Sequence, residues 1–216
     1  GRGVSACRRN PLGCLLAFAI FAPRDWRWTR LFRAGVAGLL VLALWPLSRA
    51  LIDETLAARQ FPVLADFETP FETRRWVHPS QLRTQTDIVR HGDRAARVQL
   101  TTARFSGVSL FHFPGDWRGY RSLRFSVYNP REEPMELNCR IHDVHHRDNG
   151  NAFQDRYNQQ FQLHQGWNDL NVSLDRVRAA PRGRTMDLAR IEGFGLFVVQ
   201  QPRPLTIYLD HVVLSE

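Results

Sequence analysis

An apolar stretch from Leu31 to Ile52 divides this sequence into two unlike parts. Its central run, residues 34–47, holds no charged residue, but it is too short to cross about 30 Å of hydrocarbon at about 1.5 Å per residue. The whole stretch is long enough if Arg33 and Arg49 extend toward opposite membrane surfaces. We therefore predict that residues 31–52 form a transmembrane helix in contact with the lipid bilayer. The alternative is a buried helix of a soluble protein.

The charge distribution gives this helix a direction. The chain has a net charge of +8, and residues 1–60 hold nine Arg against three acidic residues. Residues 61–216 hold twenty Arg against eighteen acidic residues, so the later segment is nearly balanced. Arg-rich flanks stay on the cytoplasmic side of a membrane. We expect a bacterial inner-membrane protein with a periplasmic or otherwise extracytoplasmic C-terminal domain. A nearly neutral domain without a basic stripe argues against nucleic-acid binding.

The apolar pattern predicts four regions. Residues 1–30 read as the end of an upstream membrane region with an Arg-rich cytoplasmic loop, and the run Leu12–Ala22 reads as the cut end of a further transmembrane helix. The span at 31–52 is followed by a helical or extended linker, 53–60, and by a domain, 61–216. The sequence begins with Gly, so we expect a piece of a longer protein. A signal peptide is disfavoured because the span lies far from the start and lacks a small-x-small cleavage site.

From residue 61 onward, short apolar or alternating runs recur between turn residues, which is typical of a β-sandwich or barrel. The strand Ser122–Tyr128 illustrates the pattern, because Leu123, Phe125 and Val127 share the face predicted to be core. Asp187–Ile191 alone resembles a helical turn. The predicted strands are Val63–Glu68, Arg74–His78, Thr86–Arg90, Ala95–Thr101, Gly107–Phe113, Ser122–Tyr128, Met135–Asp143, Tyr157–Leu163, Asn168–Leu174, Gly193–Val199 and Leu205–Leu214.

The densest polar cluster lies between residues 140 and 158. If residues 137–143 form a strand, Arg140 and His142 share one face and Asp143 lies on the other. Three readings remain open: a transition-metal site, a solvated loop whose side chains bond one another, and a sugar-binding surface. A glycosidase would need a carboxylate pair, for which Asp143 and Asp155 are the candidates.

For sugar binding, aromatic rings stack on the sugar and polar side chains bond its hydroxyls. Arg140, Asp143, Asp155 and Asn158 would bond hydroxyls and Tyr157 would stack. Trp117, Tyr120 and Trp167 are further candidate platforms. The candidate ligand-binding residues are Arg140, His142, Asp143, His145, Asp155, Tyr157, Asn158, Trp117 and Tyr120.

A separate carboxylate group joins the two ends of the domain. Asp66 and Glu68 lie on the first predicted strand and Asp210 lies on the last. If these strands pair, the three side chains approach one another and offer oxygen ligands of the kind that Ca²⁺ takes. The alternative is that they cap strands or pair with Arg. Beyond this calcium and the transition-metal reading above, the residues identify no cofactor.

Several segments of the domain carry a resemblance. LADFET, WRGYRSLRFSVYNP, RIHDVHH…DRYNQQFQL, GWNDLNVSL, APRGRTMDLARI and IYLDHVVL resemble carbohydrate-binding modules of the family-11-like type and complex I intermediate-associated proteins. This resemblance implies a mainly β fold, a galactose-binding-domain-like jelly-roll β-sandwich. The run GRGVS…NPLG at residues 1–13 is similar to a run in VanZ-like membrane proteins, some of which carry such a C-terminal domain.

The sequence therefore predicts a membrane-anchored, non-catalytic module that binds a carbohydrate or cell-envelope polymer. Two alternatives remain: a protein-interaction or assembly module of the membrane, and an enzyme acting on envelope polysaccharides.

Overall fold

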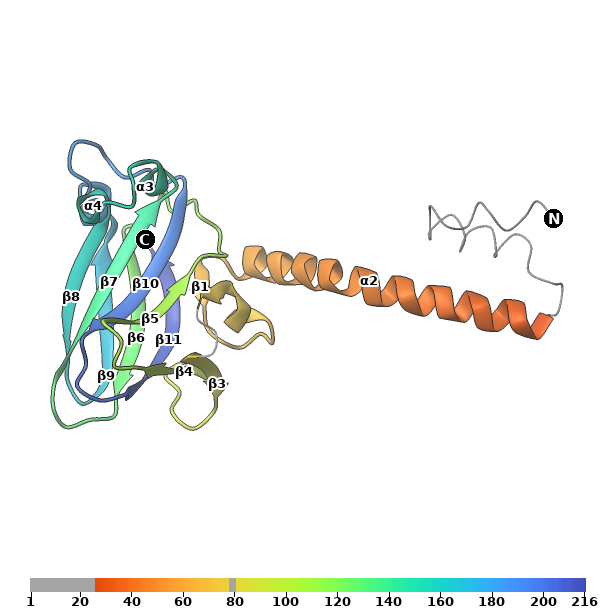
Figure 1. Cartoon of the computed structure of the whole chain (residues 1–216). Helices are drawn as coiled ribbons and strands as arrows, with labels where there is room; N and C mark the ends of the chain where they lie inside the picture. Colours follow the sequence, from red (N-terminus) through yellow and green to blue (C-terminus); the bar gives the residue numbers. More distant parts are fainter. Residues whose placement is uncertain (1–25, 78–80) are drawn as a thin grey trace. The chain divides into compact units, whose positions relative to one another are not determined.

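The computed structural model describes residues 26–77 and 81–216. The chain divides into two compact units, Gly1–Leu51 and Ile52–Glu216. The predicted apolar run Leu12–Ala22, the VanZ-like run at residues 1–13 and most of the Arg-rich loop lie outside the described residues. Figure 1 shows the long helix α2 (Trp26–Gln60) and the strands of the second unit.

Helix α2 contains the whole predicted span. Its segment Thr29–Gln60 contains an 18-residue stretch with a mean hydropathy of 1.8 and is long and apolar enough to cross a membrane. Within the described residues it is the one helix with this property. Side chains such as Leu39, Leu42 and Leu51 are more than half exposed, so the protein itself does not bury this apolar surface.

The predicted linker is the last part of α2 and already contacts the sandwich. Arg75 is almost fully buried and donates hydrogen bonds to Asp53 Oδ1 from Nε at 3.0 Å and from Nη2 at 2.7 Å. Ala57, one turn later, is also buried. Contacts of the second unit therefore begin before residue 61, because the buried guanidinium of Arg75 takes its carboxylate partner from the helix.

The second unit is a sandwich of two antiparallel sheets, as predicted. One sheet has the order β3-β4-β11-β6-β9, with β1 paired to β11, and the other has the order β2-β5-β10-β7-β8. The first and last strands pair, which is the condition set above for the carboxylates of the two ends to approach, since Val63 lies opposite Val213. In Figure 1, β7 and β10 lie side by side, and α3 and α4 lie at one end of the sandwich.

The bounds of the strands are as follows: β1 Val63–Ala65, β2 Trp76–Val77, β3 Leu82–Gln85, β4 Ala95–Leu100, β5 Phe105–Leu110, β6 Ser122–Asn129, β7 Met135–Asp143, β8 Tyr157–Leu163, β9 Gly166–Ser173, β10 Ile191–Val199 and β11 Leu205–Ser215. The short helices are η1 Glu72–Arg75, α3 His145–Asp148, η3 Phe153–Asp155 and α4 Leu174–Arg178.

The core lies between the sheets and is built from alternating positions. In β6, Leu123, Phe125 and Val127 are almost fully buried, as the alternation predicts. Phe125 contacts Phe194 of the opposite sheet, with ring centroids 5.3 Å apart. Side chains at the intervening positions therefore form the two outer faces of the sandwich.

One predicted strand is wrong, and the short helices of the domain were not predicted. Residues 86–90 are not a strand, because Gln85 Oε1 accepts the backbone N–H groups of Asp87 and Ile88 and closes a turn there. The strand β3 instead precedes this turn. A single turn is present at residues 187–190, where the Asp187 carbonyl accepts the N–H of Arg190. It is not the one helical element of the domain, because η1, α3, η3 and α4 are also present.

Candidate functional site

The polar cluster predicted at residues 140–158 separates into two regions of the sandwich. Arg140 and His142 lie on the outer face of the five-stranded sheet, while Ile141 between them is fully buried. Asn158 on β8 lies opposite Arg140, so these three predicted residues share one face. Asp143, His145 and Asp155 lie instead at the end of the sandwich, near α3. The alternation of β7 correctly predicts the shared face of Arg140 and His142.

Two glycines of β10, Gly193 and Gly195, leave the middle of this outer face without side chains of its own. A Cβ atom built at Gly195 would lie 2.8 Å from both Arg140 Nε and Ser109 Oγ. The Arg140 side chain therefore lies flat across β10 and donates to Ser109 Oγ on β5 at 3.1 Å. A Cβ atom at Gly193 would likewise meet the His142 ring at 2.3 Å. The absence of a side chain at Gly193 and at Gly195 leaves room for the His142 and Arg140 side chains of β7.

Two guanidinium groups dominate the electrostatics of this face. Arg140 and Arg156 form no ion pair with any carboxylate in the described part of the chain. Burial lowers the pKa of Arg140, and burial together with the Arg140 charge lowers the pKa of Arg156. Arg156 donates to Asn158 Oδ1 at 2.9 Å. A guanidinium has five N–H donors, so each group keeps donors available for a ligand.

The groove at the centre of this face has a volume of about 280 Å³ and is lined by Phe105, Gly107, Val108, Ser109, Arg140, Arg156, Leu196 and Phe197. Phe105 is 61% exposed and contacts Phe197 edge to face, with centroids 6.1 Å apart. Asn138, Gln160 and Glu136 continue the same face along β7 and β8. The groove thus combines an exposed aromatic edge with guanidinium donors, and amide side chains lie on the face beside it.

His142 closes one end of this face as a neutral side chain. Burial, followed by the nearby His146, lowers its pKa to about 4. Its ring lies 4.9 Å from that of His146 and 5.9 Å from that of Phe111. Its Nδ1 atom is buried and has no hydrogen-bond partner among residues 26–77 and 81–216. His142 therefore contributes an uncharged imidazole at neutral pH.

At the end of the sandwich, Arg184 binds both predicted carboxylates. Its guanidinium donates to Asp143 at 2.6 and 2.9 Å and to Asp155 at 2.6 and 2.7 Å. The Asp143 side chain is fully buried, and Asp155 is 10% exposed. The Arg184 hydrogen bonds hold the pKa of Asp155 near 2, and Arg184 and the Asp187 amide lower the pKa of Asp143.

This network corrects the roles predicted for the two carboxylates. The Asp187 amide and Asn149 supply further donors to Asp143 and Asp155, so all four oxygens accept hydrogen bonds from the protein. They cannot bond sugar hydroxyls or work as an acid–base pair without breaking these bonds. Arg184, which the sequence analysis missed, makes them a structural tie between β7, η3 and the loop at residues 179–190.

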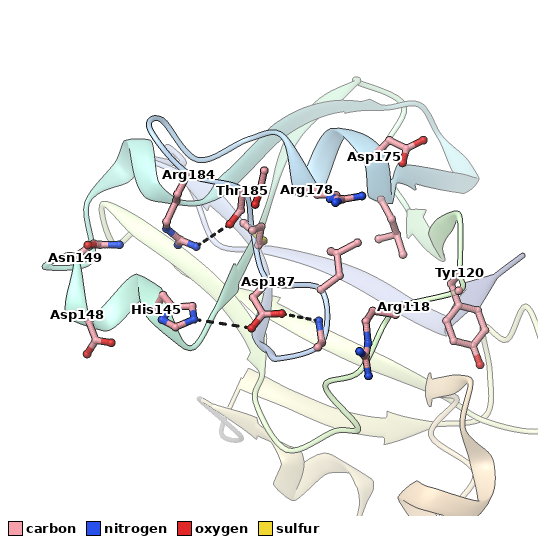
Figure 2. Close-up of a pocket in the computed structure, with 15 residues that line it drawn as sticks. Arg118, Tyr120, His145, Asp148, Asn149, Asp175, Arg178, Arg184, Thr185 and Asp187 are labelled. Atoms are coloured by element: carbon pink, nitrogen blue, oxygen red, sulfur yellow. Dashed lines mark hydrogen bonds and ion pairs between the residues drawn. The ribbon is translucent and has the colours of Figure 1, made fainter.

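An open cavity of about 780 Å³ lies beside this network (Figure 2). His145 lies in it, with its Nε2 atom 2.8 Å from Arg190 Nη2 and 3.9 Å from Asp187 Oδ2. Arg178 also lines the cavity, and its side chain forms no ion pair with the described residues. Both acidic and basic side chains line this cavity, so it lacks the uncompensated positive charge of the groove on the sheet.

The predicted aromatic platforms differ in their exposure to solvent. Trp117 is fully buried and packs 5.7 Å from Phe113, and Tyr157 is 3% exposed with its hydroxyl bonded to Gln159. Neither ring can stack on a sugar, and both predictions are wrong because the two rings fill the core. Tyr120 is half-buried, contacts Phe61 edge to face and lines the end cavity.

The predicted calcium ligands do not form a metal site. Glu68 Oε1 accepts the backbone N–H groups of Asp93 and Arg94, and Asp210 Oδ2 accepts those of Arg90 and His91. Asp66 Oδ1 accepts the Glu68 N–H at 3.2 Å. Over residues 26–77 and 81–216, no group of three or more His, Cys, Asp and Glu side chains could hold a metal ion. These carboxylates tie loops to strand ends, which is the alternative stated above.

No protein-family model matches the chain, and no curated protein matches it either. Solved structures do match. One is a family 11 carbohydrate-binding module from Clostridium thermocellum, solved with a β-1,3-1,4-mixed-linked tetrasaccharide. Its sequence identity to this chain is 16% and its TM-score is 0.50. The match covers 71% of this chain and 94% of that chain. The second unit has a carbohydrate-binding-module-like jelly-roll fold. An agarase also matches, with 13% identity and a TM-score of 0.52 over 71% of this chain but 26% of that chain.

These likenesses establish the fold of the domain. The resemblance to family 11 modules seen in the sequence is confirmed at the level of the fold, while VanZ-like identity is not tested by the described residues. The class of ligand therefore depends on the side chains that the domain exposes.

Proposed function

We propose that this protein is a membrane-anchored, non-catalytic module that binds an oligosaccharide in the groove on the outer face of the β2-β5-β10-β7-β8 sheet. The observation that carries the proposal is the position of Arg140. Its guanidinium is held over Gly195 at the centre of the face, bonded to Ser109 and to no carboxylate within the described residues. Such a group keeps directed N–H donors free for a ligand.

The neighbours of Arg140 favour a carbohydrate as the ligand. Arg156 and Asn158 add planar donors and acceptors beside it, and Phe105 adds an exposed apolar edge. A sugar ring presents hydroxyls at its rim and C–H groups on its faces, so it requires this combination. The fold shared with a module solved with a mixed-linked tetrasaccharide supports the same class of ligand.

Binding without catalysis is supported by the state of the carboxylates. Asp143 and Asp155 are fully bonded to Arg184 and to neighbouring donors, and the groove itself is lined by no carboxylate. Hydrolysis of a glycosidic bond needs two available carboxyl groups on opposite sides of the bond.

Membrane display is the second part of the proposal. The exposed apolar surface of α2 suits a lipid environment, and the Arg excess before it suits the cytoplasmic side. The module then lies in the periplasm or at the cell surface, where envelope polymers are found. Protease added outside spheroplasts should digest the domain after residue 60; full protection of the domain would contradict this orientation.

The binding experiment uses the full chain in detergent micelles. We expect it to be retained by at least one member of a panel of mixed-linked β-glucan, cellulose, laminarin, agarose and peptidoglycan. The double variant Arg140→Gln/Arg156→Gln should lose this retention, whereas Arg176→Gln, an exposed Arg on α4, should keep it. Failure of the whole panel to retain the protein, or unchanged retention of the double variant, would overturn the proposal.

A further inference from the structure

The opposite face of the sandwich carries a row of large side chains, one from each of five neighbouring strands. The register places Trp167 of β9 beside Tyr128 of β6, and Tyr128 beside Tyr208 of β11. Tyr208 lies beside Arg97 of β4, which lies beside Arg83 of β3. Neighbouring strands are about 4.8 Å apart, so the row extends over about 19 Å. This length suits a short stretch of a polymer.

The aromatic half of the row is accessible. The Tyr128 ring lies 5.4 Å from Trp167 and 5.9 Å from Tyr208, in edge-to-face contact with both. All three side chains are partly exposed, and within the described residues their polar atoms bond no protein partner. Cross-strand aromatic contacts stabilise a sheet on their own. That role explains the three rings but not the two cations that continue the same row.

The cationic half is unfavourable for the isolated domain. Arg83 and Arg97 lie directly opposite each other, and both side chains are exposed. Like charges at opposed positions repel and destabilise a strand pair. No carboxylate among the described residues forms an ion pair with either of them. The pair is therefore a place where a bound anion would relieve repulsion.

The charged side chains on the surrounding face also favour an anionic ligand. Arg124 is exposed on β6, four residues from Tyr128 and on the same side of the sheet. The exposed acidic residue beside the row, Asp169, is already paired with Arg90 at 2.8 Å. Asp210 is fully buried and accepts backbone N–H groups. The face thus offers an aromatic row followed by Arg97 and Arg83, whose positive charge is balanced by no ion pair within the described residues.

We propose that the row Trp167–Tyr128–Tyr208–Arg97–Arg83 binds a carboxylate-bearing polysaccharide lying across the strands. Sugar rings contact the three aromatic side chains, and the carboxylates of the polymer bind Arg97 and Arg83. This second surface is separate from the groove on the other sheet and does not depend on a ligand there. A protein with both surfaces can hold two glycan segments at once.

The test compares two polymers with one backbone. The full chain in detergent micelles is titrated with polygalacturonate and with its fully methyl-esterified form, which lacks the negative charge. Wild type should bind polygalacturonate at least about tenfold more tightly than the ester. Arg83→Gln/Arg97→Gln should remove this difference and leave the thermal midpoint unchanged or raised, because a repulsive pair is lost. The charge-matched control Arg121→Gln/Arg176→Gln, at exposed positions outside the row, should bind as wild type does.

Two further variants separate the surfaces. Trp167→Ala should weaken binding of polygalacturonate, with circular dichroism confirming that the sandwich is intact. Arg140→Gln, on the other sheet, should leave it unchanged. The proposal is overturned if polygalacturonate, alginate and hyaluronan all fail to bind, or if the Arg83 and Arg97 substitutions have no effect. It is also overturned if Arg140→Gln abolishes binding, or if oligothymidine binds as tightly as polygalacturonate, since aromatic and Arg side chains also bind single-stranded nucleic acid.

Discussion

Replacing Arg184 with Met should leave two buried carboxylates without their cation. The Asp143 side chain is fully buried and Asp155 is 10% exposed, and each accepts two short bonds from the guanidinium. Removing one partner of a buried ion pair costs about 3–5 kcal/mol. A domain of this size loses about 2–4 °C of melting temperature per kcal/mol. We therefore expect the midpoint of thermal unfolding to fall by about 10 °C at pH 7.

The pH dependence of this loss has a defined sign. In the wild type the folded-state pKa values of Asp143 and Asp155 are depressed, so their contribution is present above the unfolded values and is lost as the pH falls through the folded ones. Without Arg184, these buried carboxyl groups destabilise the folded state only while they are ionised. The stability deficit of Arg184→Met should therefore shrink as the pH is lowered from 7 to 4.

Urea unfolding followed by tryptophan fluorescence measures this effect, because Trp76 and Trp117 are buried in the core. Arg182→Met is the matched control on the same loop, since Arg182 is exposed and its side chain forms no hydrogen bond or ion pair with the described residues. Adding Asp143→Asn and Asp155→Asn to Arg184→Met should recover part of the stability. A deficit below about 1 kcal/mol at pH 7, or one that does not change with pH, would refute the reasoning.

Three further outcomes follow from other contacts. Burial raises the pKa of Glu72 to about 7, so the free energy of unfolding of the wild type should fall as the pH rises from 4.5 to 7. Urea midpoints of Glu72→Gln should lack this fall. The same pH dependence in the variant and the wild type would contradict the prediction. Gly195→Ala should displace the central guanidinium of the groove and weaken oligosaccharide binding about tenfold by calorimetry, while an unchanged affinity would remove the role given to that guanidinium. Asp53→Ala should destabilise the domain by about 3 kcal/mol in the same urea assay, because Arg75 is left buried and unpaired. Substitution of the exposed neighbour, Glu54→Ala, should cost less than about 0.5 kcal/mol. Equal losses in the two variants would show that the ion pair is unimportant.

The strands that form the sheet centres are predictable because their burial follows a period of two. β6, β7 and β8 match the sequence prediction to within a residue, and their apolar positions all pack between the sheets. The strand β3 is displaced from its predicted place because a side chain ends it: Gln85 bonds three backbone groups of the following turn. A hydropathy pattern carries no information about such bonds.

The candidate site was predictable only in part, for a similar reason. Strand alternation brings Arg140 and His142 to one face, and no long-range information is needed for that. The partner of Asp143 and Asp155 is Arg184, which is 41 residues from Asp143 and lies on a loop without periodicity. Trp117 could not be assigned to the core from its sequence either, because a loop folds its ring inward. Contacts made by loops decide which polar residues remain free for a ligand.

The central claim is that an oligosaccharide binds the groove on the five-stranded sheet rather than the cavity at the end of the sandwich. The most direct test is one calorimetric titration of the oligosaccharide retained in the screen, performed on wild type, Arg140→Gln and Arg178→Gln. Arg140 lies in the groove and Arg178 lines the end cavity. The account predicts that Arg140→Gln lowers the affinity at least about tenfold and that Arg178→Gln leaves it unchanged. Loss of binding in Arg178→Gln with normal binding in Arg140→Gln would contradict it.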